Sequence, residues 1–123
     1  MPRHRTENTR NLNVIRVNVD ISAKMKEELV NYKDKHFNGS TSSWLGNLLE
    51  GYLHSGGLNA RLTPELITRF ESMGDIAYNG LGFYLSPELC EGLDELCKRN
   101  MRNRKQQLAH FIYSIYSTFC VLK

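Results

Sequence analysis

The sequence has no apolar run that approaches the roughly 20 residues of a membrane-spanning helix. Its arginine-rich start, Met1-Pro2-Arg3-His4-Arg5, is not followed by the apolar core of a secretion signal. Cysteine is scarce, with three residues. Cys90 and Cys97 are about two helical turns apart, roughly 10 Å, which is too far for a disulfide. We therefore expect a cytoplasmic protein without a membrane partner, whose thiols are buried and reduced.

The chain also lacks the residue clusters that enzymes use. Its histidines are scattered, no group of Cys, His, Asp and Glu has metal-ligand spacing, and Gly56-Gly57 lacks the strand and helix that frame a phosphate loop. Trp44 and the tyrosines recur at helical spacing, which is typical of a packed core rather than of a cofactor site. We expect no enzymatic activity, no metal and no cofactor.

What the chain does have is an ordinary composition with localised positive charge. Its 123 residues are 41% hydrophobic and 24% charged, enough for one globular core. The net charge is +3. The basic residues gather near the start, at Arg3, Arg5, Arg10 and Arg16, and in a second cluster, Lys98, Arg99, Arg102, Arg104 and Lys105. Such patches suit polyanions, although a solubilising tail and a solvated turn would give the same pattern.

Residues 1–13, called the N-terminal arm below, are polar and basic and show no periodicity. We expect this segment to be flexible, and to lie along phosphates or reach a minor groove when DNA is present.

Residues 14–57 carry the pattern of a strand followed by two helices. In residues 14–21 apolar and polar positions alternate as in a half-buried strand, and Ile15, Val17, Val19 and Ile21 are expected to face a core. Ser22, and then Ser40 or Thr41, are placed to cap two amphipathic helices. The apolar stripes are Met25, Leu29 and Tyr32 in the first helix, and Trp44, Leu45, Leu48, Leu49, Tyr52 and Leu53 in the second.

A second unit of this kind is expected over residues 79–123, after a linker at residues 58–78 whose short helix Thr63 caps and Pro64 begins. The two patterns repeat at an offset of about 63 to 64 residues, with a possible cap at Asn103. The expected strand has Leu81, Phe83 and Leu85 inward and Gly80, Gly82 and Tyr84 outward. Its helices would bury Leu89, Cys90, Leu93, Leu96 and Cys97, and then Leu108, Phe111, Ile112, Ile115, Tyr116 and Phe119.

One strand cannot form a sheet, and two short helices cannot enclose a core, so each unit needs a partner unit. The order of elements and the spacing from Ile21 to Ser40 resemble the ribbon-helix-helix DNA-binding domains of the Arc/MetJ superfamily. The repetition is similar to the tandem, single-chain members, such as the TraY-type accessory proteins of conjugative relaxosomes. The resemblance implies a mainly α fold with a short two-stranded antiparallel β-ribbon, in which two β-α-α units form an intramolecular pseudo-dimer packed as one domain. Pairing between chains remains an alternative.

The resemblance implies sequence-specific binding of double-stranded DNA, with the ribbon in the major groove and the start of each second helix at a phosphate. The protein would be a transcriptional repressor or a relaxosome accessory protein, and its further partner on DNA would be another protein or further copies bound side by side. Arg16 suits guanine and Asn18 suits adenine. The other expected base contacts are Val14 and Tyr84. The expected phosphate contacts are Ser40, Thr41, Ser42, Asn103, Arg104, Lys105, Arg3, Arg5 and Arg10.

Other interpretations need no DNA. Arg16 and Asn18 could be solvated residues of an edge strand, and the polar residues at the helix starts could be ordinary caps. The main alternative function is a protein-interaction module, an antitoxin or an adaptor, that binds a partner protein through its helices, with DNA binding secondary or absent. Exposure of Phe111, Ile115 and Phe119 would favour this alternative, and the two roles are compatible.

Overall fold

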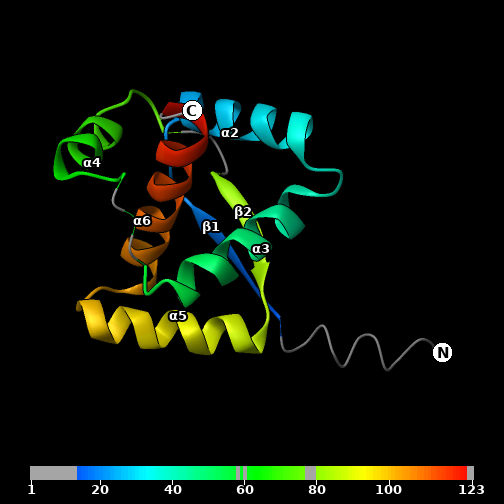
Figure 1. Ribbon diagram of the computed structural model, residues 1–123, viewed down its shortest axis with the longest axis vertical. Helices are drawn as coiled ribbons and strands as arrows, with labels where there is room; N and C mark the ends of the chain where they lie inside the picture. Colours follow the sequence, from blue (N-terminus) through cyan, green and yellow to red (C-terminus); the bar gives the residue numbers. More distant parts are fainter. Residues whose placement is uncertain (1–13, 58, 60, 77–79, 122–123) are drawn as a thin grey trace.

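The computed structural model describes residues 14–57, 59, 61–76 and 80–121. Within these residues the chain is mainly helical with one two-stranded antiparallel sheet, as expected (Figure 1). The elements, in order, are β1 (Ile15–Val19), α2 (Ala23–His36), α3 (Thr41–His54), α4 (Pro64–Glu71), β2 (Leu81–Leu85), α5 (Pro87–Asn100), α6 (Arg104–Tyr116) and the short π-helix η1 (Ser117–Val121). The N-terminal arm lies outside the described residues, as do parts of the expected linker.

Each helix from α2 to α6 begins at a polar side chain that accepts a hydrogen bond from the backbone N–H three residues later. The capping residues are Ser22, Ser40, Thr63, Ser86 and Asn103. Such caps satisfy N–H groups that have no partner within the helix. At Asn103 the bond is reciprocal, because Gln106 Oε1 accepts from the Asn103 backbone N–H at 2.9 Å. The expected caps at Ser22, Ser40, Thr63 and Asn103 are confirmed.

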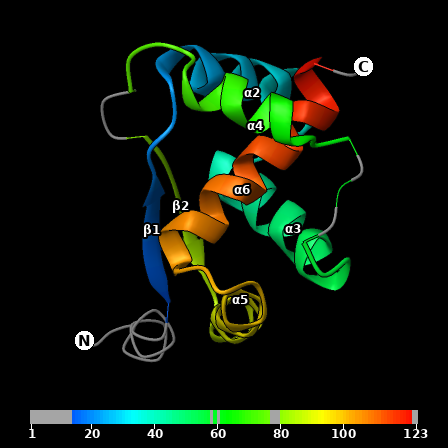
Figure 2. The same ribbon diagram turned by 90° about the vertical axis from the view of Figure 1, so that its left-hand side faces the viewer.

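The ribbon pairs strands from distant parts of one chain. In its register Arg16 lies opposite Tyr84, Val17 opposite Phe83 and Asn18 opposite Gly82. The helices lie on one side of this ribbon (Figure 2). The expected inward residues of β2, Leu81, Phe83 and Leu85, are all buried.

Two expectations about the strands were wrong. Ile15 is not buried; it lies on the same face as its buried partner Leu85 but is 42% exposed, because it is the first residue of β1 and lies at the end of the ribbon. Gly80 does not face outward. It is buried just before β2 with a φ of 54°, and a Cβ there would lie 2.3 Å from the carbonyl oxygen of Val19. Glycine is therefore required where the chain enters the ribbon.

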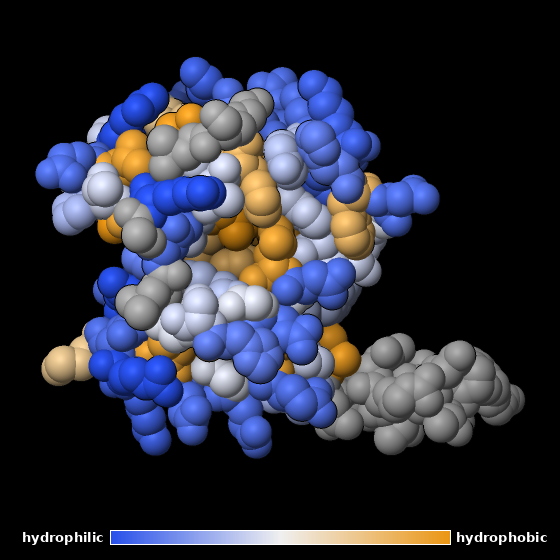
Figure 3. Space-filling model, in the orientation of Figure 1, coloured by the Kyte–Doolittle hydropathy of each residue, from blue (hydrophilic) through white to orange (hydrophobic). Residues whose placement is uncertain are grey.

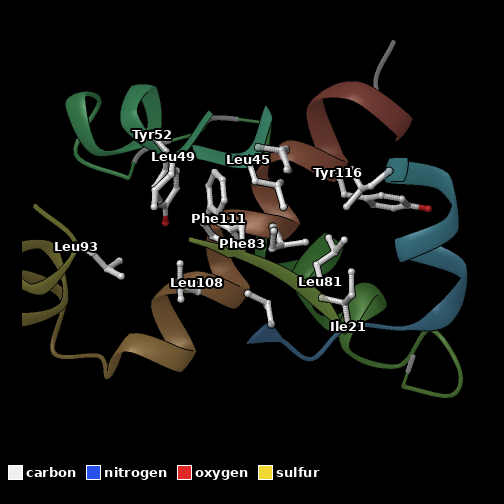
Figure 4. Close-up of a cluster of buried hydrophobic side chains, with 14 of the residues drawn as sticks. Ile21, Leu45, Leu49, Tyr52, Leu81, Phe83, Leu93, Leu108, Phe111 and Tyr116 are labelled. Atoms are coloured by element: carbon white, nitrogen blue, oxygen red, sulfur yellow. The ribbon is translucent and has the colours of Figure 1, made fainter. Parts of the chain in front are cut away.

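The core lies between the ribbon and the helices. Figure 4 shows Phe83 and Leu81 of β2 directed toward side chains of α3 and α6, among them Leu45 and Phe111. The apolar stripe expected in the last helix is buried from Leu108 to Tyr116. Beyond it, η1 packs against α2, where the rings of Phe119 and Tyr32 stack with centroids 4.9 Å apart.

The two halves of the described chain have matching elements. Helices α2 and α5 each contain 14 residues and begin about 64 positions apart, and α3 and α6 begin about 63 positions apart. In the ribbon, the Asn18–Gly82 pair, next to the central Val17–Phe83 pair, has an offset of 64 positions. The helix starts therefore have the offset of about 63 to 64 residues that the sequence pattern has.

The cysteines differ in part from expectation. Cys97 is buried, whereas Cys90 and Cys120 are only half-buried; none of the three forms a disulfide. Burial raises the pKa of the Cys90 and Cys97 thiols. Among the described residues no helix has the length and apolar character to traverse a membrane, and no three His, Cys, Asp or Glu side chains are grouped to hold a metal.

Candidate nucleic-acid interface

The ribbon face turned away from the core carries three polar side chains. Arg16 and Asn18 of β1 are exposed, and Tyr84 of β2 is 50% exposed. The Arg16 guanidinium carbon lies 5.3 Å from the centre of the Tyr84 ring, a cation–π geometry. This contact crosses the ribbon, because the two residues are paired in the register. It orients the guanidinium while its N–H donors remain open to solvent.

Gly82 makes the packing of these side chains possible, and the sequence pattern gave no role to it. A Cβ at Gly82 would lie 2.3 Å from Arg16 Nη2 and 2.5 Å from Asn18 Oδ1. The two side chains of β1 therefore occupy the space over β2 that a side chain at this position would fill. The polar groups of one strand thus extend over both strands of the ribbon.

The start of α3 adjoins β2. The Ser42 hydroxyl oxygen accepts a hydrogen bond of 3.2 Å from the Tyr84 backbone N–H. Ser40 caps the helix through the Ser43 N–H at 3.0 Å. Thr41, the first residue of α3, is half-buried. The first turn of α3, with its partial positive charge, therefore lies next to the strand that carries Tyr84.

The start of α6 adjoins the other end of the ribbon. Lys105 Nζ lies 3.5 Å from Asp20 Oδ2, just after β1. Both side chains are more than half exposed, so this ion pair contributes little to stability and leaves the ammonium open to other anions. Asn103, the cap of α6, is exposed. The two helix starts therefore flank the ribbon, one beside each strand.

Two of the expected contact residues, Arg104 and Val14, are less open to DNA than Arg16 and Asn18, because Arg104 is ion-paired and Val14 is half-buried. Arg104 donates two hydrogen bonds to the Asp94 carboxylate, at 2.9 and 3.1 Å, and this partner raises the pKa of the guanidinium. Its charge is therefore already paired within the protein. Val14 is half-buried and precedes β1, where it lines a groove together with Ser42 and Tyr84. Arg3, Arg5 and Arg10 fall outside the described residues.

A buried polar network fixes α3 relative to α5 and α6. The Tyr52 hydroxyl accepts from Gln107 Nε2 at 2.7 Å and lies 2.8 Å from His110 Nδ1. Gln107 is fully buried, and its Oε1 accepts from Asn100 Nδ2 at 3.1 Å. Burial raises the pKa of Tyr52 to about 12 and lowers the pKa of His110 below its ordinary value. Neutral groups in this network hold the helices whose starts flank the ribbon.

On the helical face, the three described residues whose exposure would favour a protein-interaction module are not exposed. Phe111 and Ile115 are buried, and Phe119 is half-buried against Tyr32 and Trp44. Figure 3 shows this face with polar residues around its margin and apolar residues in a central hollow. The residues whose exposure would have favoured the alternative are therefore part of the packing.

No protein-family model, curated protein or solved structure matches the chain.

Proposed function

We propose that this protein binds double-stranded DNA by inserting the β1–β2 ribbon into the major groove. The observation that carries the proposal is the outward ribbon face, where Arg16, Asn18 and Tyr84 project from two paired strands between two helix starts. A major groove is about 12 Å wide and admits a two-stranded ribbon.

The ribbon side chains suit the donor and acceptor groups of bases. Arg16 donates two hydrogen bonds to O6 and N7 of guanine, and Asn18 pairs with N6 and N7 of adenine. Tyr84 contacts a thymine methyl group or a sugar. Because Arg16 rests on the Tyr84 ring, less rotational freedom is lost when it binds a base.

The helix starts suit phosphates. The first N–H groups of α3 and α6 and the helix dipoles favour an anion, and Ser42 adds a hydroxyl while Lys105 adds a charge. These contacts would set the position of the ribbon on the duplex without reading its sequence. Lys105 would exchange Asp20 for a phosphate.

The matching helix lengths and offsets support a tandem ribbon-helix-helix arrangement, in which the two units form a pseudo-dimer within one chain. On the resemblance of the sequence pattern, the role would be that of a repressor or a relaxosome accessory protein.

Selection from random duplex DNA, followed by footprinting and a salt titration of the selected site, tests the proposal. We expect one enriched sequence and an affinity that falls steeply with salt, by a slope of about 0.9 in log K per neutralised phosphate. No enrichment together with a slope near zero would reject DNA binding.

A further inference from the structure

A groove runs along the outer side of α3, between this helix and the start of α5. Its volume is about 1030 Å³, which is room for a peptide segment rather than for a single ion. Val14, Gly46, Asn47, Glu50, Glu88 and Leu89 are among its lining residues. A second hollow, which shares Glu50 and Glu88, extends it past Leu53 and His54. We call this surface the α3 groove.

The matching surface of α6 is partly covered by the chain itself, at Tyr113 and Tyr116. Gln106, Ala109, His110 and Tyr113 lie about 63 positions after the groove residues Ser43, Gly46, Asn47 and Glu50. Ile67 and Glu71 of α4 line a hollow of about 460 Å³ together with these residues, and the ring of Phe70 contacts Tyr113 and Tyr116, with centroids 5.7 and 5.2 Å away. A segment of the same chain, α4, thus packs beside one of the two matching surfaces, whereas no such segment among the described residues packs along the α3 groove.

The α3 groove is acidic. Glu50 and Glu88 are exposed, and neither has an ion-pair or hydrogen-bond partner among the described residues. Glu91, also exposed, follows Glu88 one turn later on α5. An occupant with positive charge would neutralise these carboxylates, and an acidic occupant would be repelled.

The N-terminal arm fits this groove in charge, reach and point of attachment. Residues 1–13 contain Arg3, Arg5 and Arg10 against Glu7 alone. The arm joins the described chain at Val14, which is itself part of the groove wall. Thirteen residues span up to about 43 Å when extended, and α3 is about 21 Å long. The arm therefore has the length to follow the whole helix.

We propose that the N-terminal arm docks in the α3 groove when no DNA is bound, with its arginines beside Glu50 and Glu88. The groove begins next to Ser42 and Tyr84, at the ribbon, and leads away from it along α3. A docked arm is thus directed away from the phosphates near the ribbon. On the proposed function, DNA competes with the groove for the same arginines, and the groove restrains non-specific binding.

Limited trypsin digestion of the full chain without DNA tests the docking directly. The test variant is Glu50→Gln/Glu88→Gln, and the control is Glu27→Gln/Glu65→Gln, which removes two exposed carboxylates outside the groove. At low salt we expect cleavage after Arg5 and Arg10 to be several-fold faster in the test variant than in the wild type and the control. The difference should disappear at high salt, where the charges are screened. Trp44 fluorescence during denaturation checks that all three chains are folded.

Equal cleavage rates in the three chains would overturn the proposal. Protection that increases with protein concentration would also overturn it, because the arm would then bind a second copy.

A duplex-binding cycle separates this inference from the proposed function. We expect Glu50→Gln/Glu88→Gln to tighten binding to a random duplex several-fold more than the control does. The excess should vanish when Arg3, Arg5 and Arg10 are all changed to Gln. If the tighter binding persists without the three arginines, the two carboxylates repel DNA directly, and the arm is not involved. If no chain binds DNA, the proposed function fails while the digestion still reports on the groove.

Discussion

Replacing Arg16 by alanine should weaken DNA recognition in one half of the binding site only. At an offset of 64 positions, which is the offset of the Asn18–Gly82 pair, the position that matches Arg16 is Gly80, just before the other strand. Gly80 has no side chain and cannot gain one without strain, because its φ is 54° and a Cβ would lie 2.3 Å from Val19 O. The proposed arginine–base contact would therefore be made once for each ribbon.

The expected loss follows from the geometry of the guanidinium. A bidentate arginine–guanine contact contributes about 1–3 kcal/mol of discrimination, which is a factor of about 5 to 150 in affinity. The cation–π contact with Tyr84 exists in the free protein as well, so its loss changes stability more than DNA affinity. A base contact also leaves the salt slope nearly unchanged, whereas removing a phosphate contact lowers it by about 0.9.

The assay is selection from random duplex DNA with the wild type and Arg16→Ala, followed by salt titration on the selected site and mass measurement at low protein concentration. Arg69→Ala, which removes an exposed arginine of α4, is the control. We expect a non-palindromic site and relaxed preference in one half. A palindromic site with equal losses in both halves, bound by an obligate dimer, would refute pairing within one chain as the basis of recognition.

Three further predictions concern the scaffold, each measured by chemical denaturation. Leu108→Ala should lower the free energy of unfolding by about 2–5 kcal/mol, because the side chain is 3% exposed in the core; near-normal stability would contradict its core position. Tyr52→Phe should cost about 1–3 kcal/mol, because the buried amide of Gln107 loses its acceptor, and a neutral effect would mean that the amide finds another partner. Burial lowers the pKa of His110, so the unfolded chain binds the proton more readily and stability should fall as the pH drops below about 6.5. His110→Gln should remove that part of the pH dependence while His54→Gln retains it, and an unchanged profile in His110→Gln would assign the effect to other groups.

The local structure could be predicted because its causes are local in sequence. A cap and the N–H that it accepts are three residues apart, as at Ser22 and Asn103, and an apolar stripe such as Leu108 to Tyr116 recurs at the helical period. The alternation in β2 likewise identified its buried face. The partner of each strand is not a local property, so the sequence left open whether the ribbon forms within one chain or between two.

The details of the candidate interface depend on contacts between distant segments, which periodicity does not encode. Arg104 was expected to be available for phosphate, but its charge is paired with Asp94 on the preceding helix. Gly82 appeared to be a blank position, although its missing side chain leaves space for Arg16 and Asn18. The exposure of Ile15 depends on where the ribbon ends. A glycine that faces a long polar side chain across a strand pair is the signal that could have located this site.

Pairing within one chain changes what the two strands are required to carry. In a ribbon made by two identical chains, each substitution appears twice, so every outward residue must suit both halves of the site. Here β1 supplies Arg16 and Asn18, and β2 supplies the clearance at Gly82 and the ring of Tyr84 on which the guanidinium rests. The two contributions are complementary, because a bulky residue at Gly82 would displace the groups that β1 presents.

A duplicated ribbon with two copies of β1 would place Asn18 opposite Asn18 and leave Arg16 without its aromatic support. The proposed recognition surface therefore depends on two strands with different sequences. Replacing either strand by a copy of the other should abolish DNA recognition, although the sequences of the helices are unchanged.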